Sequence, residues 1–171
     1  VGNSLFNKAT AGLDDEEKLD FNIENAQVFK AEMDNANATY VWGPVTFQIE
    51  DSSGNKKDLM EDFEKLTEDE VLTHSKTIWN AGADMKIPTA DEHLTKEAVQ
   101  LRIRSVMMSK FIRNSLKKSA RRILDLNKKK FQFKHVADGR IEEDGPMMLK
   151  LIYDRINPST RVGVRNLTNK L

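Results

Sequence analysis

The sequence predicts an all-α fold, a helical domain of about six helices with a short extended or hairpin segment near residues 40–50. Two observations favour helices. Apolar residues recur at steps of three and four over most of the chain, which is the spacing of one buried helix face. Several of these stretches also begin with residues that are typical of helix N-termini. The clearest alternation of apolar and polar residues, at Val45, Phe47 and Ile49, predicts the extended segment.

The N-terminal part is expected to hold one helix after an arm of residues 1–13. Residues 14–17 are all acidic and suit a helix start, because carboxylates stabilise the positive end of the helix dipole. Helical spacing of apolar residues then continues to about Asn37. Trp42-Gly43-Pro44 and residues 51–55 predict two turns, one on each side of the extended segment.

Two further helices are expected before residue 80. Apolar residues between Leu59 and Leu66 mark a short one. Thr67 and Glu70 have the spacing of a capping box, in which each side chain bonds the other residue's backbone amide, and this pair opens the second helix. Gly82 is a plausible helix stop. Residues 81–89 are interpreted as a linker, and so as the boundary between two lobes.

The stretch from Leu94 to Lys134 is the organising element of the predicted fold. It is expected to form a long central helix that begins at Thr89 with Glu92 or at Thr95, and that is apolar on nearly every side as far as Asn114. Such a helix belongs in a protein interior or between subunits. Beyond Asn114 a single apolar stripe continues, and basic residues occupy the opposite side.

The C-terminal part predicts two more helices. Asp144-Gly145-Pro146 starts the first, because proline at the first helical position needs no amide partner, and Pro158 ends it. Ser159 or Thr160 caps a last helix, with Val164, Leu167 and Leu171 on one stripe. We expect the chain to be a fragment or processed product of a longer protein, because it lacks an initiator Met and ends inside a helical pattern.

Charge is strongly segregated along the chain, although the formal net charge is +0. Residues 1–92 hold twenty acidic and eight basic side chains, whereas residues 102–135 hold twelve basic side chains and one acidic side chain. We therefore predict an acidic lobe, 1–80, and a basic lobe, 89–171, packed as one unit. Two interpretations stay open. The two halves fold against each other, so that their charges cancel, or the separation of charge indicates polyanion binding or head-to-tail association.

Several function classes lack their sequence signals. The absence of cysteine excludes disulfides, thiolate zinc sites and a cysteine nucleophile. No apolar run of about eighteen residues exists, so we expect no membrane partner. The three histidines stand far apart and are interpreted as surface or capping residues, so no metal site is expected. No phosphate-binding glycine loop or nucleophile elbow is present. We expect a non-enzymatic, cytoplasmic protein, in an intracellular particle or virion, with no cofactor and no small-molecule substrate.

The basic side of the central stretch is the strongest functional signal. The lysines and arginines from residue 117 to residue 129 would span roughly 20 Å of helix. This is long enough to follow several phosphates of RNA or another polyanion. Only Phe131 and Phe133 could stack on bases, so contacts without sequence choice are expected. The alternative is a solvated helix face that maintains solubility. The candidate nucleic-acid-binding residues are Arg113, Lys117, Lys118, Arg121, Arg122, Lys128, Lys129 and Lys130.

Apolar residues on the predicted helices are candidates for contacts between copies of the chain. The set combines methionines, which form adaptable binding surfaces, with large aromatic residues. Core filling is the alternative interpretation of the same spacing. The candidate self-association residues are Trp79, Met107, Phe111, Met147 and Met148.

The second part of the chain, about residues 58–171, resembles the Gag-type capsid region of Ty/copia-like retroelements. One set of matching residues precedes the linker, and the others are short steps in later helices. The first set is Val71, Ser75 and Trp79. The later matches are Phe111-Ile112, Ser115-Leu116, Ala120, Phe131-Gln132-Phe133, Asp144 to Lys150 with Ile152, Asn157, Ser159-Thr160 and Leu167.

This resemblance implies a retrotransposon or viral structural protein, an all-helical capsid domain that assembles with copies of itself around its own RNA. It implies no individual site residue, because capsid function depends on surfaces. The sequence departs from the family in lacking a cysteine-rich zinc knuckle, and the segment around Trp42-Gly43-Pro44 matches no part of it.

Two functions from different classes are therefore expected of this chain. The first is a capsid-like, Gag-like assembly protein that forms homo-oligomeric shells or filaments, so that its partner is itself, with RNA packaged through the basic helix. The second is a nucleic-acid-binding module that acts as a monomer or dimer. A small enzyme, with a site built from dispersed Asp, Glu and His residues, is the remaining alternative.

Overall fold

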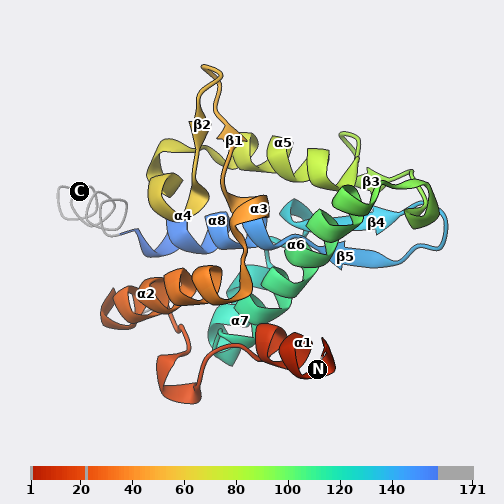
Figure 1. The fold of residues 1–171 in the computed structure, drawn as a ribbon. Coiled ribbons are helices and arrows are strands. Elements are labelled where there is room, and N and C mark those ends of the chain that lie inside the picture. The colour runs from red at the N-terminus through yellow and green to blue at the C-terminus, as the bar shows by residue number, and fades with distance from the viewer. Residues whose placement is uncertain (1, 22, 158–171) are drawn as a thin grey trace.

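The structure, a computed structural model, describes residues 2–21 and 23–157, and these are mostly helical (Figure 1). Two small sheets accompany the helices, so the expected all-α class is too narrow. The expected last helix, with Val164, Leu167 and Leu171, lies outside the described residues. Eight α-helices occur in the described residues: α1 (Gly2–Ala11), α2 (Ile23–Tyr40), α3 (Gly43–Thr46), α4 (Leu59–Asp62), α5 (Glu68–Trp79), α6 (Lys96–Asn114), α7 (Lys118–Asp125) and α8 (Gly145–Ile156).

Short 3-10 turns and strands connect these helices. The turns are η1 (Asp15–Glu17), η2 (Phe63–Lys65), η3 (Asp91–His93) and η4 (Lys128–Lys130). The strands are β1 (Ile49–Glu50), β2 (Lys56–Lys57), β3 (Lys86–Ile87), β4 (Gln132–His135) and β5 (Ile141–Glu143). Figure 1 shows α5 and α2 on opposite sides of α8, with the three-stranded sheet at one end of the molecule.

Three predicted helix starts are confirmed by their caps. The Thr67 hydroxyl accepts a bond from the Glu70 amide, and the Glu70 carboxylate accepts one from the Thr67 amide, which completes the capping box of α5. Thr95 caps α6 through the amide of Ala98. Asp144 caps α8 through the amide of Met147, with Pro146 inside the first turn. Helix α5 ends at Asn80 in a left-handed conformation, two residues before the predicted stop at Gly82.

The extended segment differs from its prediction in position. Gly43-Pro44 opens the short helix α3 where a turn was expected, because proline suits a helix start as well as a turn. The hairpin lies further along the chain, where β1 pairs with β2 in antiparallel register, Ile49 opposite Lys57. Residues 51–55 form its turn, as predicted, and the hairpin stands out from the body of the molecule in Figure 1.

The predicted linker, residues 81–89, contains strand β3. It pairs in parallel with β4, which pairs in antiparallel register with β5. Because β3 has only two residues, its sequence carries no alternation from which a strand could be recognised. This pairing ties the segment between the two predicted lobes to the C-terminal half of the chain.

The prediction of one long central helix is wrong, because α6 ends at Asn114. Two backbone bonds hold the break: the Leu19 amide donates to the Ser115 carbonyl at 2.9 Å, and the Lys117 amide donates to the Leu19 carbonyl at 2.9 Å. The Leu13 amide also donates to the Ser115 hydroxyl at 3.1 Å. A segment nearly one hundred residues away thus takes the backbone groups that would continue the helix. Helix α7 then runs in a new direction and ends at Asp125.

One hydrophobic cluster contains buried side chains from both predicted lobes. Phe29 and Met33 of α2 and Val71 of α5 belong to it together with Met108 of α6 and Ile152 of α8. Helix α6 contacts α1 and α8, and α5 contacts α8. The two predicted lobes therefore share one hydrophobic core.

Asp144 lies at the junction of α5, α6 and α8 and is completely buried. Its carboxylate accepts hydrogen bonds from the Ser75 hydroxyl at 2.5 Å, the Ser105 hydroxyl at 2.8 Å and the Trp79 indole N–H at 2.9 Å, besides its bond as the α8 cap. Buried polar groups are stable when their hydrogen bonds are satisfied, and this network joins the three helices at one point.

Candidate functional site

Helix α7 presents a row of basic side chains because its apolar residues face the core. Ala120 and Leu124 are buried, while the lysines and arginines between and before them are exposed. The 3-10 turn η4 adds two more exposed lysines a few residues on. We define the basic surface as Lys117, Lys118, Arg121, Arg122, Lys128 and Lys129.

The six side chains of the basic surface make no ion pair within residues 2–21 and 23–157. The first turn of α7 contains no acidic residue, so nothing there offsets the positive end of the helix dipole. Lysines 117 and 118 stand at this end and add their charge to it. The surface therefore attracts anions with a potential of one sign.

Two of the eight candidate nucleic-acid-binding residues have structural roles instead. The Arg113 guanidinium pairs with Glu143 at 2.6 Å and with Asp125 at 2.9 Å, and so joins α6 to β5 and α7. Burial lowers the pKa of Arg113, but these two carboxylates outweigh burial and raise that pKa above its ordinary value. Lys130 pairs with Glu68 of α5 at 3.1 Å. Arg113 is therefore occupied by two carboxylates, while Lys130 stays exposed in its ion pair with Glu68.

The two aromatic residues that were expected to stack on bases are buried. Phe133 stacks on Trp79 with ring centroids 5.9 Å apart, and Phe131 is buried beside the Arg113 guanidinium. Their alternation follows strand β4, whose inward face joins the core. The basic surface therefore has charge but no base-stacking platform from these residues.

Four of the five candidate self-association residues lie in the core of a single copy. Trp79, Phe111, Met147 and Met148 are each at most 3 % exposed, so they have no surface to offer a neighbour. Core filling, the alternative interpretation, accounts for them. Met107 is half-buried and reaches the surface, where it lines two pockets.

One of these pockets, of about 230 Å³, lies where α1, α6, η3 and the strands β4 and β5 meet. One side of it is apolar and the other is a network of charged residues. The apolar side consists of Phe6, Val99, Ile103, Val106 and Met107, with Trp79 behind them. The polar side consists of Asp91, Arg102, His135, Arg140 and Glu142.

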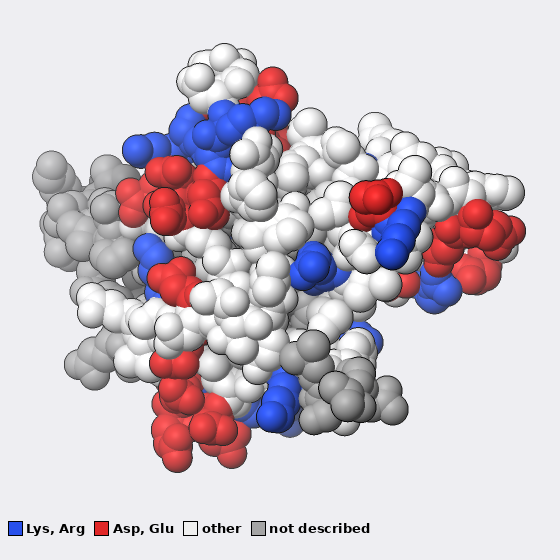
Figure 2. All heavy atoms as spheres, in the orientation of Figure 1, with Lys and Arg blue, Asp and Glu red and all other residues white. Residues whose placement is uncertain are grey.

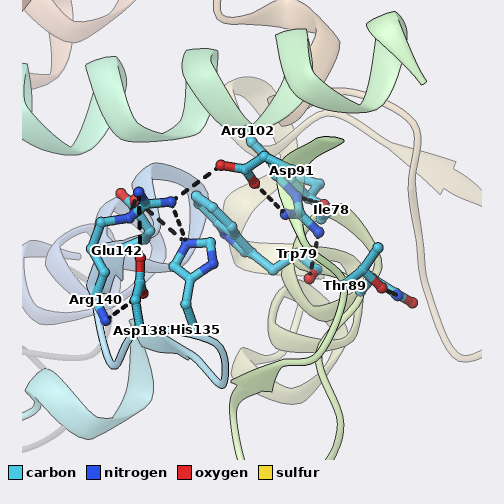
Figure 3. A network of polar contacts seen from close by, with 10 residues as sticks. Ile78, Trp79, Thr89, Asp91, Arg102, His135, Asp138, Arg140 and Glu142 are labelled. Atoms are coloured by element: carbon cyan, nitrogen blue, oxygen red, sulfur yellow. Dashed lines mark hydrogen bonds and ion pairs between the residues drawn. The ribbon is translucent and has the colours of Figure 1, made fainter. Parts of the chain in front are cut away.

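Figure 3 shows Asp91 between the guanidinium groups of Arg102 and Arg140, each at 3.2 Å. Arg102 is buried and also donates to the carbonyls of Ile78 and Trp79, the last two residues of α5. Burial lowers the pKa of Arg102, and the charge of Asp91 opposes this effect. The three bonds position η3 and the end of α5 against α6.

Arg140 completes the network on the strand side. Its guanidinium pairs with Glu142 at 3.0 Å and lies 3.2 Å from the Nε2 atom of His135. Burial lowers the pKa of Arg140, but Asp91, Glu142 and Asp138 together raise it above its ordinary value. His135 is buried, so its interpretation as a surface or capping histidine is wrong. No sequence pattern connects these residues, which come from four separate elements.

Within the described residues, no three His, Cys, Asp or Glu side chains gather closely enough to hold a metal ion. Each helix there is too short or too polar to cross a membrane. Neither the charged network nor the basic surface places a nucleophile beside a general base. The basic surface can bind by charge, and the pocket beside the charged network can bind by apolar contact.

Comparisons with known proteins give no further guide to this chain. No protein-family model, no curated protein and no solved structure matches it. The function is therefore argued from the exposed surfaces themselves.

Proposed function

We propose that this chain is a non-enzymatic protein that binds RNA, without sequence choice, through the basic surface. The observation that carries the proposal is the set of six exposed cations without ion pairs among the described residues. Solvated basic residues on a protein surface are commonly paired or dispersed. Here they form three adjacent pairs, at the start of one short helix, within it and on the turn that follows it.

The dimensions and chemistry of the basic surface suit a phosphate backbone. The eight residues of α7 rise about 12 Å, enough for three or four phosphates of a single strand at about 3.4 Å each. Lysine and arginine side chains neutralise phosphates and release counterions, which makes the affinity depend on salt. If all six cations contribute, log K falls with log salt concentration with a slope of about −4 on single strands.

Fluorescence anisotropy with labelled 20-nucleotide RNAs of different sequence, at 50 to 300 mM salt, tests this function. The triple variant Lys118→Glu, Arg121→Glu, Arg122→Glu is expected to weaken binding at least about 100-fold and to flatten the salt slope. The matched control reverses three exposed lysines elsewhere, Lys8, Lys86 and Lys96, with the same change in net charge. Equal losses in both triple variants, or binding that salt leaves unchanged, contradict the proposal.

Self-assembly is the second candidate function, and a specific observation favours it. The acidic half of the chain does not neutralise the basic surface, which pairs with no acidic residue among those described. Ion pairs that do join residues 1–92 to residues 102–135 in the described part of the chain include Lys130 with Glu68 and Arg102 with Asp91. Figure 2 shows acidic atoms gathered over α4 and over the segment before α2. An acidic surface on one copy can therefore meet the basic surface of the next, a contact that propagates into shells or filaments.

The resemblance to retroelement capsid regions supports both candidates together, since a capsid domain holds RNA and contacts copies of itself. Assembly around RNA would put the chain in an intracellular particle or virion. Charge carries both contacts, so RNA and a second copy compete for the basic surface. Low salt strengthens each of them.

A further inference from the structure

The α1–α6 face of the molecule has two adjoining pockets that share Met107. The first is the pocket beside the charged network, of about 230 Å³. The second, of about 270 Å³, lies between α6, α1 and the end of α2, with Val41, Trp42 and Arg104 in its wall. A cavity of about 150 Å³ holds a benzene ring, so each pocket has room for a bulky side chain. Helix α1 borders both, through Phe6 and Ala9.

Exposed apolar side chains surround these pockets. Phe6 is 41 % exposed, Ile103 50 % and Val41 51 %. Single exposed apolar residues are ordinary on protein surfaces, but here three of them border two pockets with Met107 between. Figure 2 shows an uncharged surface over α3, with a basic side chain beside it over α6. Apolar anchors that enter pockets provide most of the binding energy at protein interfaces.

A buried donor in the second pocket's wall lacks an acceptor. The indole N–H of Trp42 has no hydrogen-bond partner among the residues that the structure describes, although the side chain is only 1 % exposed. Such donors are uncommon, and each has a cost in stability. The second pocket thus has apolar volume, and Trp42 in its wall has an indole N–H that is buried without a partner among the described residues.

The wall of the second pocket carries the positive charge of Arg104, whereas the first pocket is lined by both signs, with Asp91 and Glu142 beside Arg102 and Arg140. Helices α1 and α6 together contain one acidic residue, Glu97, and six basic ones, of which Arg102 and Arg113 form ion pairs. The four of these six that form no ion pair among the described residues are Lys8, Lys96, Arg104 and Lys110. Arg104 lies in the second pocket's wall and donates to the Val41 carbonyl at 2.8 Å, with no ion pair in the described part of the chain. The Lys110 ammonium lies 5.5 Å from the centre of the Phe6 ring. A partner with carboxylates beside its apolar residues complements this rim.

We propose that the α1–α6 face binds an amphipathic helix of another protein, with bulky apolar residues on one side and acidic residues flanking them. Two apolar side chains of that helix occupy the two pockets on either side of Met107. Its carboxylates lie near Arg104 and Lys110. This mode of recognition, a helix on an apolar surface, is read from anchors spaced three or four residues apart.

Three labelled synthetic peptides of eighteen residues test the proposal against the full chain by fluorescence anisotropy. The first has Leu and Phe at helical spacing with Glu on the remaining positions. The second replaces each Glu with Lys, and the third keeps Glu but replaces Leu and Phe with Ser. The first peptide is expected to bind saturably, and the other two at least tenfold more weakly.

Variants of the chain locate the binding. Ile103→Glu changes a half-exposed position, where folding tolerates the change, and is expected to weaken the affinity for the first peptide at least tenfold. Arg104→Glu is expected to weaken the same affinity severalfold. Val28→Glu is the matched control, because Val28 is 45 % exposed on α2, away from both pockets. It is expected to leave the affinity within twofold. Circular dichroism checks that each variant is folded.

Several results would overturn this inference. One is the absence of saturable binding of the first peptide to the wild-type chain. Equal binding of the first and third peptides means attraction by charge alone, and indifference to Ile103→Glu places the contact elsewhere. If the wild-type chain binds no peptide but associates with itself, and Ile103→Glu abolishes that association, the face is a contact between copies of the chain. The triple variant of α7 must still bind the first peptide, so the RNA function can fail without affecting this result.

Discussion

A single buried carboxylate, Asp144, fixes the relative positions of three helices. Each of its two oxygens accepts two hydrogen bonds: Oδ1 from Trp79 and Ser105, Oδ2 from Ser75 and the Met147 amide. The sequence identified Asp144 as a helix cap, but the contacts from α5 and α6 join residues 39 and more positions away. Nothing in the local pattern predicts them.

Asp144→Asn is expected to destabilise the fold by about 2–3 kcal/mol, because the amide NH2 would face two donors that then lack an acceptor. Urea unfolding followed by circular dichroism measures the change. Asp138→Asn is the control, since Asp138 is exposed and an Asn oxygen can still accept its bond from the Arg140 amide. Similar losses in both variants would show that the Asp144 network contributes nothing specific.

Two Gly-Pro pairs open helices in this chain, and only one of the two glycines is sterically required. A Cβ on Gly145 would lie 2.7 Å from the Cβ and Cγ atoms of Met108 in α6. A Cβ on Gly43 would lie 3.5 Å from the nearest ring atom of Phe47, an ordinary contact. The close approach of α8 to α6 therefore depends on the absence of a side chain at Gly145.

Gly145→Ala is expected to cost about 1–3 kcal/mol of unfolding free energy, the usual range for overpacking a core. Gly43→Ala changes the same residue type at the same helix position and is expected to shift stability by less than about 0.5 kcal/mol. Thermal and urea unfolding of both variants provide the comparison. A Gly145→Ala protein as stable as the wild type would mean that α6 and α8 separate without cost.

At the scale of elements, His74 connects α5 to the end of α3. Its Nε2 atom lies 2.9 Å from the Val45 carbonyl oxygen. Burial lowers the pKa of His74, and the charge of Lys56 lowers it further, while the bond to Val45 and the charge of Asp144 act in the opposite direction. The folded state therefore prefers neutral imidazole at this position.

A folded-state pKa below the unfolded value of about 6.5 makes stability fall as pH decreases from 7. Below pH 6.5 the unfolded chain binds a proton at His74, whereas the folded chain does not until the pH falls below the folded-state pKa. Stability is therefore lost between these two pKa values. Urea unfolding at pH 7, 6 and 5 is expected to show a smaller loss in His74→Gln than in the wild type. His93→Gln, at an exposed histidine, is the control, and equal losses in all three proteins would exclude this role.

Three helix starts could be predicted from the sequence, while the break after α6 could not. The helix start expected at residues 14–17 is wrong, because residues 15–17 form the 3-10 turn η1 and α2 begins at Ile23, and the expected arm of residues 1–13 contains helix α1. The caps at Thr67, Thr95 and Asp144 are local, since each side chain bonds the amide three residues ahead. The end of α6 depends on Leu19, whose backbone bonds Ser115 and Lys117 across the fold. Apolar spacing continued through this break because α7 also needs a buried stripe.

The candidate sites also differ in whether they depend on local sequence or on contacts across the fold. The exposure of Lys118, Arg121 and Arg122 follows from the helical spacing of Ala120 and Leu124, so the sequence indicates the basic surface directly. The pocket beside Asp91 and Arg140 combines side chains from α1, η3, α6, β4 and β5. Only the tertiary fold brings such residues together, and apolar residues at the surface of α6 have the same spacing as core residues.

At the scale of the whole molecule, the separation of charge predicts head-to-tail association. The acidic residues 14–16 are exposed on the segment before α2, and the basic surface lies on α7 and η4. Opposite charges on separate surfaces attract between copies, and salt screens this attraction over about 8–10 Å at physiological ionic strength. Sedimentation velocity is expected to show oligomers at 50 mM salt that dissociate at 500 mM.

A charge exchange distinguishes this association from non-specific attraction. Reversal of Lys118, Arg121 and Arg122 to Glu, or of Asp14, Asp15 and Glu16 to Lys, is expected to abolish association of each variant with itself at 50 mM salt. A mixture of the two variants is expected to regain a complex, because the reversed acidic segment of one then faces the reversed basic helix of the other. Salt should dissociate this mixed complex as it does the wild-type oligomer. If both variants and their mixture sediment as the wild type does, the two charged surfaces do not meet, and assembly must use another part of the chain.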